Sequence, residues 1–183
     1  MKRSTMAERA PDAWRGDKGA KSKTNGIECL TSAALRHGRV HVAAGSVVSY
    51  SGTAVVNAAN EGCLTGGGVD GAITSAGGKG LAQARQELPL IEKPGRRGTI
   101  RCPTSEAKTT VAGDLLCSWV IHAVGPNYRM HTHEGEADVL LYMAYRAAIL
   151  EARQKQMPDV AFSLLSVGHH PRELSNVGAR VIV

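Results

Sequence analysis

The chain has 183 residues, of which 43% are hydrophobic and only 4% are aromatic, so it can bury one mainly aliphatic core. It contains no run of about 18 consecutive apolar residues, which excludes a predicted membrane span. The formal net charge of +6 at pH 7 would suit an anionic partner, unless the charge is confined to one segment.

Most of the positive charge is indeed confined to the N-terminus. Residues 1–26 contain seven Lys or Arg against three Asp or Glu, with little apolar periodicity. We therefore predict that residues 1–26 form a disordered basic tail and that residues 27–183 form one folded domain. A solvated tail is expected, and weak binding to nucleic acid or another anionic surface is the alternative.

The cysteines show no metal-binding spacing, and the pairs His131/His133 and His169/His170 resemble metal ligands only superficially. The four cysteines are Cys29, Cys63, Cys102 and Cys117.

No apolar segment follows the basic N-terminal residues, so no signal peptide is predicted. We expect an intracellular protein, cytoplasmic or nuclear, with reduced thiols, no cofactor, no metal and a monomeric state. His122 lies in an apolar run and is expected to be a core residue.

Short apolar runs alternate with amphipathic segments along the rest of the chain. Strands are predicted at residues 39–45, 53–60, 106–115, 117–126 and 160–168, and helices at residues 69–88 and 134–156. Glycines at positions 77, 78 and 80 should weaken or bend the first helix. The second helix should bury a stripe of Leu140, Met143, Ala144, Ala147 and Leu150. This order predicts a layered α/β fold with a mixed, largely parallel sheet.

Three predicted strand ends indicate where a ligand would bind. In open α/β sheets, ligands bind beyond the carboxyl ends of the strands. Asn60, Gly125 and Gly168 each follow such an end. Their loops are therefore expected to converge on one rim of the sheet.

Three consecutive glycines, Gly66–Gly68, precede the first predicted helix. Bare N–H groups there can bind a phosphate, but a tight turn would also need glycine for its dihedral angles alone. Val69 and Asp70 stand where a P-loop has lysine and serine or threonine, so no triphosphate is expected. The segment matches the GxGxxG pattern of a Rossmann fold, but the five residues between Asn60 and Gly66 disfavour that fold.

Three segments, in this order, resemble the macro domain family. NAAN and GGGVDGAI, within residues 57–73, resemble its first ligand loop. IHAVGPNY, residues 121–128, resembles its central strand, and AFSLLSVG, residues 161–168, resembles its last glycine loop. The resemblance implies a three-layer α/β/α fold with a mixed central sheet. It also implies a site for ADP-ribose or an ADP-ribosylated protein.

The resemblance implies roles for individual residues. Asn60 would bind the distal ribose, and Asp70 would orient a water, as in family branches that hydrolyse mono-ADP-ribose from proteins or deacetylate O-acetyl-ADP-ribose. These two are the catalytic candidates, although Asp70 could serve only as an acid at a helix N-terminus. The ligand-binding candidates are Asn57, Gly66, Gly67, Gly68, Val69, Ser166, Val167, Gly168 and His170. For Asn57, a role in ordering the loop is favoured.

Several positions depart from the family pattern. Ser46 stands where an aspartate commonly contacts the adenine, Thr74 replaces a helix histidine of some hydrolase branches, and His170 replaces an aromatic residue. The chain ends 15 residues after Gly168, so a divergent, shortened C-terminus is expected. Asp70 favours an enzyme, whereas the altered last loop favours a non-catalytic module that reads ADP-ribose. Hydrolysis is the preferred expectation.

Overall fold

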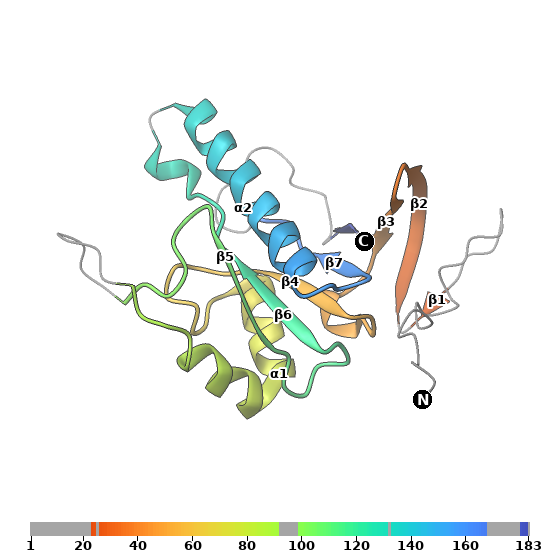
Figure 1. Ribbon diagram of the computed structural model, residues 1–183, viewed down its shortest axis with the longest axis horizontal. Coiled ribbons are helices and arrows are strands. Elements are labelled where there is room, and N and C mark those ends of the chain that lie inside the picture. The colour runs from red at the N-terminus through yellow and green to blue at the C-terminus, as the bar shows by residue number, and fades with distance from the viewer. Residues whose placement is uncertain (1–22, 25, 92–98, 132, 168–179, 183) are drawn as a thin grey trace, which may run out of the picture.

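The computed structural model describes residues 23–24, 26–91, 99–131, 133–167 and 180–182. Nearly all of the predicted basic tail, together with Gly168 and His170, lies outside these residues. Figure 1 shows a sheet that runs through the molecule with a helix on either side. Among the described residues, no helix combines the length and the hydropathy needed to cross a membrane.

The described residues form one sheet of eight strands in the order β1-β2-β3-β8-β7-β4-β6-β5. The strands are β1 (Lys23–Thr24), β2 (Ile27–Leu35), β3 (Gly38–Ala44), β4 (Ala54–Ala58), β5 (Ala107–Val111), β6 (Trp119–Ala123), β7 (Val160–Phe162) and β8 (Arg180–Ile182). The sheet is mixed, as predicted. Only β4 pairs in parallel, with β6 and β7, and the other pairs are antiparallel. The expectation of a largely parallel sheet is therefore wrong.

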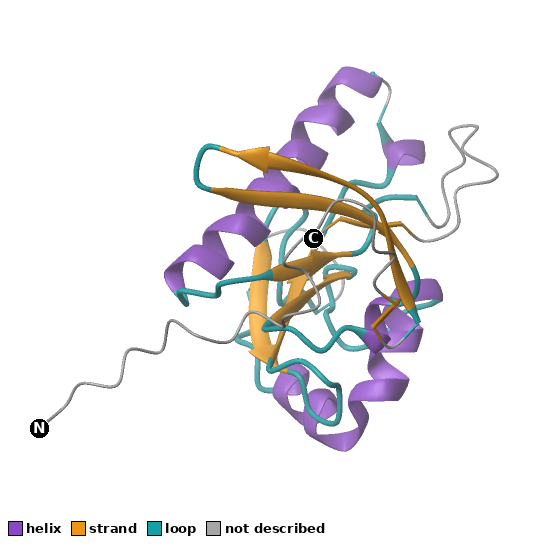
Figure 2. Cartoon of the chain, turned by 90° about the vertical axis from the view of Figure 1, so that its right-hand side faces the viewer, coloured by secondary structure: helices purple, strands orange, loops and turns teal. Residues whose placement is uncertain are grey.

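The central strands bury side chains on both faces, which explains their apolar sequences. Val55 of β4 and Val120 of β6 belong to the core cluster on one face, where Ile73 of helix α1 (Gly68–Gln86) also packs. The next residue of each strand points to the opposite face, under helix α2 (Glu134–Gln154). Figure 2 shows the helices from the side. The two layers of helix confirm the α/β/α arrangement.

Helix α2 forms where it was predicted, but a different face of it is buried. Its buried residues are alanines: Ala137, Ala144, Ala148 and Ala152. Leu141, Tyr145 and Ala147 are partly buried against the same core. Met143 and Leu150, which were predicted to be buried, are each 38% exposed. Alanine lets a helix lie close to a sheet, so the most deeply buried side chains of α2 are its small ones. The prediction of the buried stripe is therefore wrong at these two positions.

The hairpin of β2 and β3 lies near one end of the sheet, next to the edge strand β1 (Figure 1). The predicted strand at residues 39–45 is confirmed as β3. Strand β2 was not predicted, because its sequence alternates poorly and most of its side chains are exposed. It is held by its antiparallel pairing with β3, from Glu28 opposite Ala44 to Leu35 opposite Gly38.

The carboxyl ends of β4, β6 and β7 lie at the same edge of the sheet, because these three strands are parallel. The loop after β4 shares a buried cluster with the loop after β6, through Cys63 and Val124. An ideal Cβ on Gly125 would collide with Ser166 Oγ, so the loops after β6 and β7 also touch. The predicted convergence at this rim is confirmed for Asn60 and Gly125.

Helix α1 bends sharply, as its glycines predicted. Gly78 has φ +60° and ψ −155°, outside the helical region. Just before it, the Gly77 carbonyl accepts a 3.0 Å hydrogen bond from the Asp114 N–H. An ideal Cβ on Gly77 would lie 3.0 Å from the Ala112 carbonyl oxygen and would collide with Leu81. Glycine therefore lets the bend approach the turn between β5 and β6.

Replacing Gly77 by alanine should destabilise the protein. The added methyl group has no space, and overpacking of this kind costs about 1–3 kcal/mol. We expect Gly77→Ala to lower the free energy of unfolding by that amount in urea denaturation. Gly38→Ala is the matched control, since a Cβ there meets nothing within 4 Å. Equal stability of the two variants would contradict the packing of the bend.

Candidate functional site

The loop between β4 and α1 presents bare backbone at the rim. Gly67 is the N-cap residue of α1, with φ −94° and ψ 179°, and no side chain caps this end of the helix. Gly68 begins the helix with φ +58°, a conformation that favours glycine. Among the described residues, no oxygen accepts a hydrogen bond from the N–H groups of Gly66, Gly67, Gly68 or Val69. These four donors are available to an anion.

Asn60 braces the same loop from its exposed position after β4. Its Nδ2 donates a 2.8 Å hydrogen bond to the Thr65 carbonyl, and its Oδ1 accepts a 3.2 Å hydrogen bond from the Cys63 N–H. The Cys63 backbone has φ +52°, so the loop turns tightly here. The side chain of Asn60 thus fixes the path of the chain into the glycines.

Asp70 is buried beneath the loop and paired with Arg85. Their side chains are 3% and 0% exposed. Arg85 Nη1 donates to Asp70 Oδ1 at 2.8 Å, and Nη2 donates to Oδ2 at 3.3 Å. Arg85 also donates to Thr74 Oγ1 at 2.7 Å and to the Cys63 carbonyl at 2.5 Å. One guanidinium therefore ties the glycine loop to the first two turns of α1.

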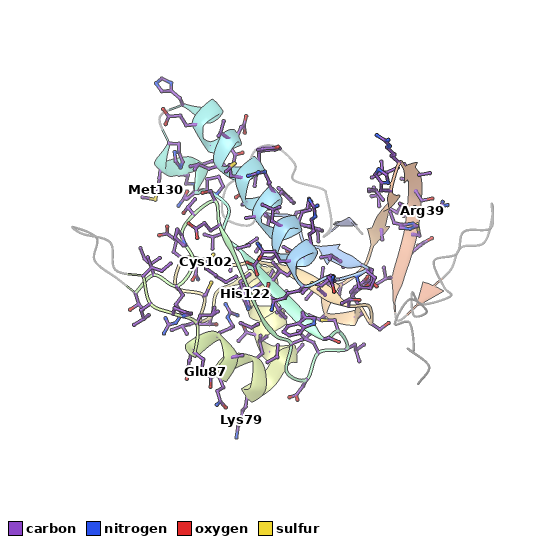
Figure 3. All side chains as sticks on the ribbon, viewed as in Figure 1. Arg39, Lys79, Glu87, Cys102, His122 and Met130 are labelled. Atoms are coloured by element: carbon purple, nitrogen blue, oxygen red, sulfur yellow. The ribbon has the colours of Figure 1, made fainter. Side chains whose placement is uncertain are left out.

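A second, uncharged arm of this network runs into the sheet. Asn57 Nδ2 donates to Asp70 Oδ1 at 2.8 Å and lies 3.1 Å from His122 Nδ1. His122 Nε2 lies 2.9 Å from Thr110 Oγ1. Burial, and then the nearby Arg85 charge, lower the pKa of His122 to about 3, so its ring is neutral. Figure 3 shows His122 in the interior of the molecule.

The loop after β7 contributes a strained serine. Ser166 has φ +60°, and its buried Oγ has no hydrogen-bond partner among the described residues. Val167, the next residue, is 49% exposed. This loop touches Gly125. It follows β7, which pairs in parallel with β4, so it lies at the same edge of the sheet as the glycine loop.

The predicted site residues thus fall into three groups. Asn57, Asn60, Gly66, Gly67, Gly68, Val69 and Asp70 gather around the start of α1. Ser166 and Val167 belong to the loop after β7, and Gly168 and His170 lie outside the described residues. No cluster of three or more His, Cys, Asp or Glu that could hold a metal ion occurs in the described part of the chain.

Arg85 is the residue that sequence reasoning missed. It lies on the buried side of α1 with Ile73, Gly77 and Leu81, all spaced by four residues. A charged residue on the buried side of a helix normally needs a buried partner of opposite charge. The place of Arg85 on this apolar stripe was therefore the signal in the sequence that could have identified it. The partner was not evident because Asp70 lies 15 residues upstream.

The buried neutral His122 predicts a specific dependence of stability on pH. The unfolded histidine binds a proton below about pH 6.5, whereas the folded one stays neutral down to about pH 3. Between these values the unfolded state binds more protons, so the free energy of unfolding falls as the pH is lowered. The maximum slope from one such group is about 1.4 kcal/mol per pH unit.

We expect His122→Gln to flatten this slope between pH 6.5 and 4, measured by urea denaturation at each pH. The exposed His37 supplies the matched control, and His37→Gln should keep the slope of the parent protein. A slope unchanged by His122→Gln would contradict a neutral buried ring.

Comparison with known proteins identifies the family. The family model of the macro domain matches residues 56–176. An O-acetyl-ADP-ribose deacetylase of Escherichia fergusonii is 38% identical over 130 residues, which cover 71% of this chain and 68% of that protein. A macro domain-containing protein of Caldanaerobacter subterraneus is 40% identical over 131 residues, covering 71% and 69% of the two chains.

Solved structures agree with the sequence relatives. The Oceanobacillus iheyensis macrodomain with ADP aligns with a TM-score of 0.67 and 30% identity, covering 77% of this chain and 72% of that chain. The Trypanosoma brucei macrodomain in complex with ADP aligns with a TM-score of 0.55 and 30% identity, covering 68% and 46%. The chain therefore belongs to the macro domain family.

Proposed function

We propose that the protein binds ADP-ribose, free or attached to a protein, at the start of α1. The observation that carries this proposal is the set of four backbone N–H groups, from Gly66 to Val69, that have no acceptor among the described residues. Aligned N–H groups at a helix N-terminus bind phosphate oxygens, and glycine leaves no side chain in the way. Macrodomains solved with ADP or ADPR supply the ligand class.

The spacing of three residues supports the same site. Variants of the Oceanobacillus iheyensis macrodomain have been solved with an asparagine, a glycine or an aspartate replaced, and these positions are separated by seven and three residues. Asn60, Gly67 and Asp70 are the same residue types at the same spacing. We take them to mark the corresponding positions of the site in this protein.

In this proposal the diphosphate accepts hydrogen bonds from the N–H groups of Gly66, Gly67, Gly68 and Val69. Asn60 lies beside the distal ribose, where its second Nδ2–H and the second lone pair of its Oδ1 can bond to hydroxyl groups. Ser166, on the loop after β7, can donate from its hydroxyl group, which has no hydrogen-bond partner among the described residues. Val167, Gly168 and His170 remain our prediction for the rest of that wall.

The similarity to an O-acetyl-ADP-ribose deacetylase favours a second function, hydrolysis of an ester or ADP-ribosyl bond at the distal ribose. Asp70 would act in it by orienting a water. Its Oδ1 already accepts two short hydrogen bonds, whereas its Oδ2 accepts one at 3.3 Å and lies against Gly66. The water would therefore bond to Oδ2, and the carboxylate, which is itself held in place, would orient that water toward the bond to be hydrolysed.

Incubation with O-acetyl-ADP-ribose or with a mono-ADP-ribosylated protein tests this second function. We expect release of acetate or of ADP-ribose, respectively, detected by chromatography. Binding of ADP-ribose without release of either product would instead assign the protein as a reader of ADP-ribose.

Binding itself is tested by substitutions at the N-cap of α1. A Cβ on Gly67 meets nothing within 4 Å, and its backbone angles suit an ordinary N-cap residue. Gly67→Asp and Gly67→Asn should therefore both fold. The aspartate adds a negative charge where the diphosphate binds, so we expect it to weaken ADP-ribose binding at least about tenfold relative to the asparagine.

Calorimetry with ADP-ribose measures this difference, and ATP and NAD serve as ligand controls. Thermal denaturation checks that both Gly67 variants are folded. Equal affinities of the Asp and Asn variants would contradict a diphosphate at the start of α1.

A further inference from the structure

We propose that Arg85 is a positioning residue that makes the glycine loop acceptable to an anionic ligand, because it neutralises the Asp70 carboxylate directly beneath that loop. The inference rests on the proposed binding of ADP-ribose. In this inference the ion pair, besides contributing to stability, removes a negative charge that would oppose the binding of ADP-ribose.

The carboxylate of Asp70 touches the backbone that would hold the diphosphate. An ideal Cβ on Gly66 would lie 2.6 Å from Asp70 Oδ2, so only glycine fits against this oxygen. Asp70 is also the third residue of α1, whose first N–H groups are the proposed phosphate donors. A carboxylate without a counterion at this position would repel the phosphates from behind their own binding loop.

Arg85 supplies that counterion. Within the described residues, it is the only cation that bonds to Asp70. The other donor to the carboxylate, Asn57, is uncharged, and the His122 ring behind Asn57 is neutral. The charge that the ligand meets beneath the loop is therefore the sum of Asp70 and Arg85, which is close to zero.

The bend of α1 makes this pairing geometrically feasible. In a straight helix, two residues 15 positions apart are separated by about 22 Å along the axis, beyond the reach of an arginine side chain. The non-helical Gly78 lies between Asp70 and Arg85 and turns the second half of α1 back toward the first. Arg85 then reaches Cys63, Asp70 and Thr74 with one guanidinium.

If Arg85 neutralises Asp70, neutral substitutions of the two residues should have opposite effects on the affinity for ADP-ribose. Arg85→Gln leaves Asp70 unpaired and should weaken ADP-ribose binding about tenfold or more. Asp70→Asn is isosteric and leaves Arg85 unpaired, so it should tighten binding. The neutral double variant Asp70→Asn/Arg85→Gln should return to within about threefold of the parent affinity. A merely structural role would weaken binding in all three variants.

Calorimetric titration of ADP-ribose into each variant decides between these roles. Arg85→Lys, which keeps the charge and loses the planar fork, should bind more tightly than Arg85→Gln. Arg146→Gln removes an exposed arginine of α2 and is the matched control for net charge; it should bind like the parent protein. Thermal denaturation verifies that each variant is folded.

Tighter binding by Asp70→Asn would support the inference even if Arg85→Gln does not fold. Weaker binding by Asp70→Asn, or a double variant no tighter than Arg85→Gln, would overturn it. If the parent protein binds no ADP-ribose at all, the proposed function fails first and the inference falls with it. If the parent binds and the opposite effects are absent, only the inference fails.

Discussion

The geometry of the candidate site depends on one buried ion pair, between Asp70 and Arg85. Removing two charges from water is costly, and such a pair is tolerated only when its remaining donors and acceptors are also satisfied. Here Arg85 bonds to Asp70, Thr74 and the Cys63 carbonyl, and Asp70 accepts further from Asn57. The pair therefore holds the loop, the first turns of α1 and the end of β4 in one arrangement.

The bare backbone and the buried polar network have complementary tasks. Glycine keeps side chains away from the four N–H groups at the start of α1, but it cannot hold a loop in one conformation by itself. Rigidity comes from Asn60 at the surface and from Arg85 below it. The neutral arm through His122 supports Asn57 without adding charge. A preorganised set of donors of this kind loses little entropy when an anion binds.

Sequence reasoning succeeded where a local pattern reflects the final environment. The apolar run at residues 53–60 predicted a strand, and the glycines at 77 and 78 predicted the bend of α1. It failed where tertiary packing decides between similar patterns: α2 carries apolar residues on two sides, and its fully buried residues are alanines. Strand β2 has no strong pattern of its own, and Arg85 finds its partner only through the bend. Such long-range pairings leave little trace in a single sequence.

The most direct measurement is a titration of isotopically labelled protein with ADP-ribose, followed by the backbone N–H resonances in nuclear magnetic resonance spectra. We predict that the resonances of Gly66, Gly67, Gly68 and Val69 shift together to lower field. These shifts should saturate at the molar ratio of ADP-ribose to protein that calorimetry gives. Movement of other resonances with these four unchanged would contradict the claim that the exposed backbone at the start of α1 binds the diphosphate.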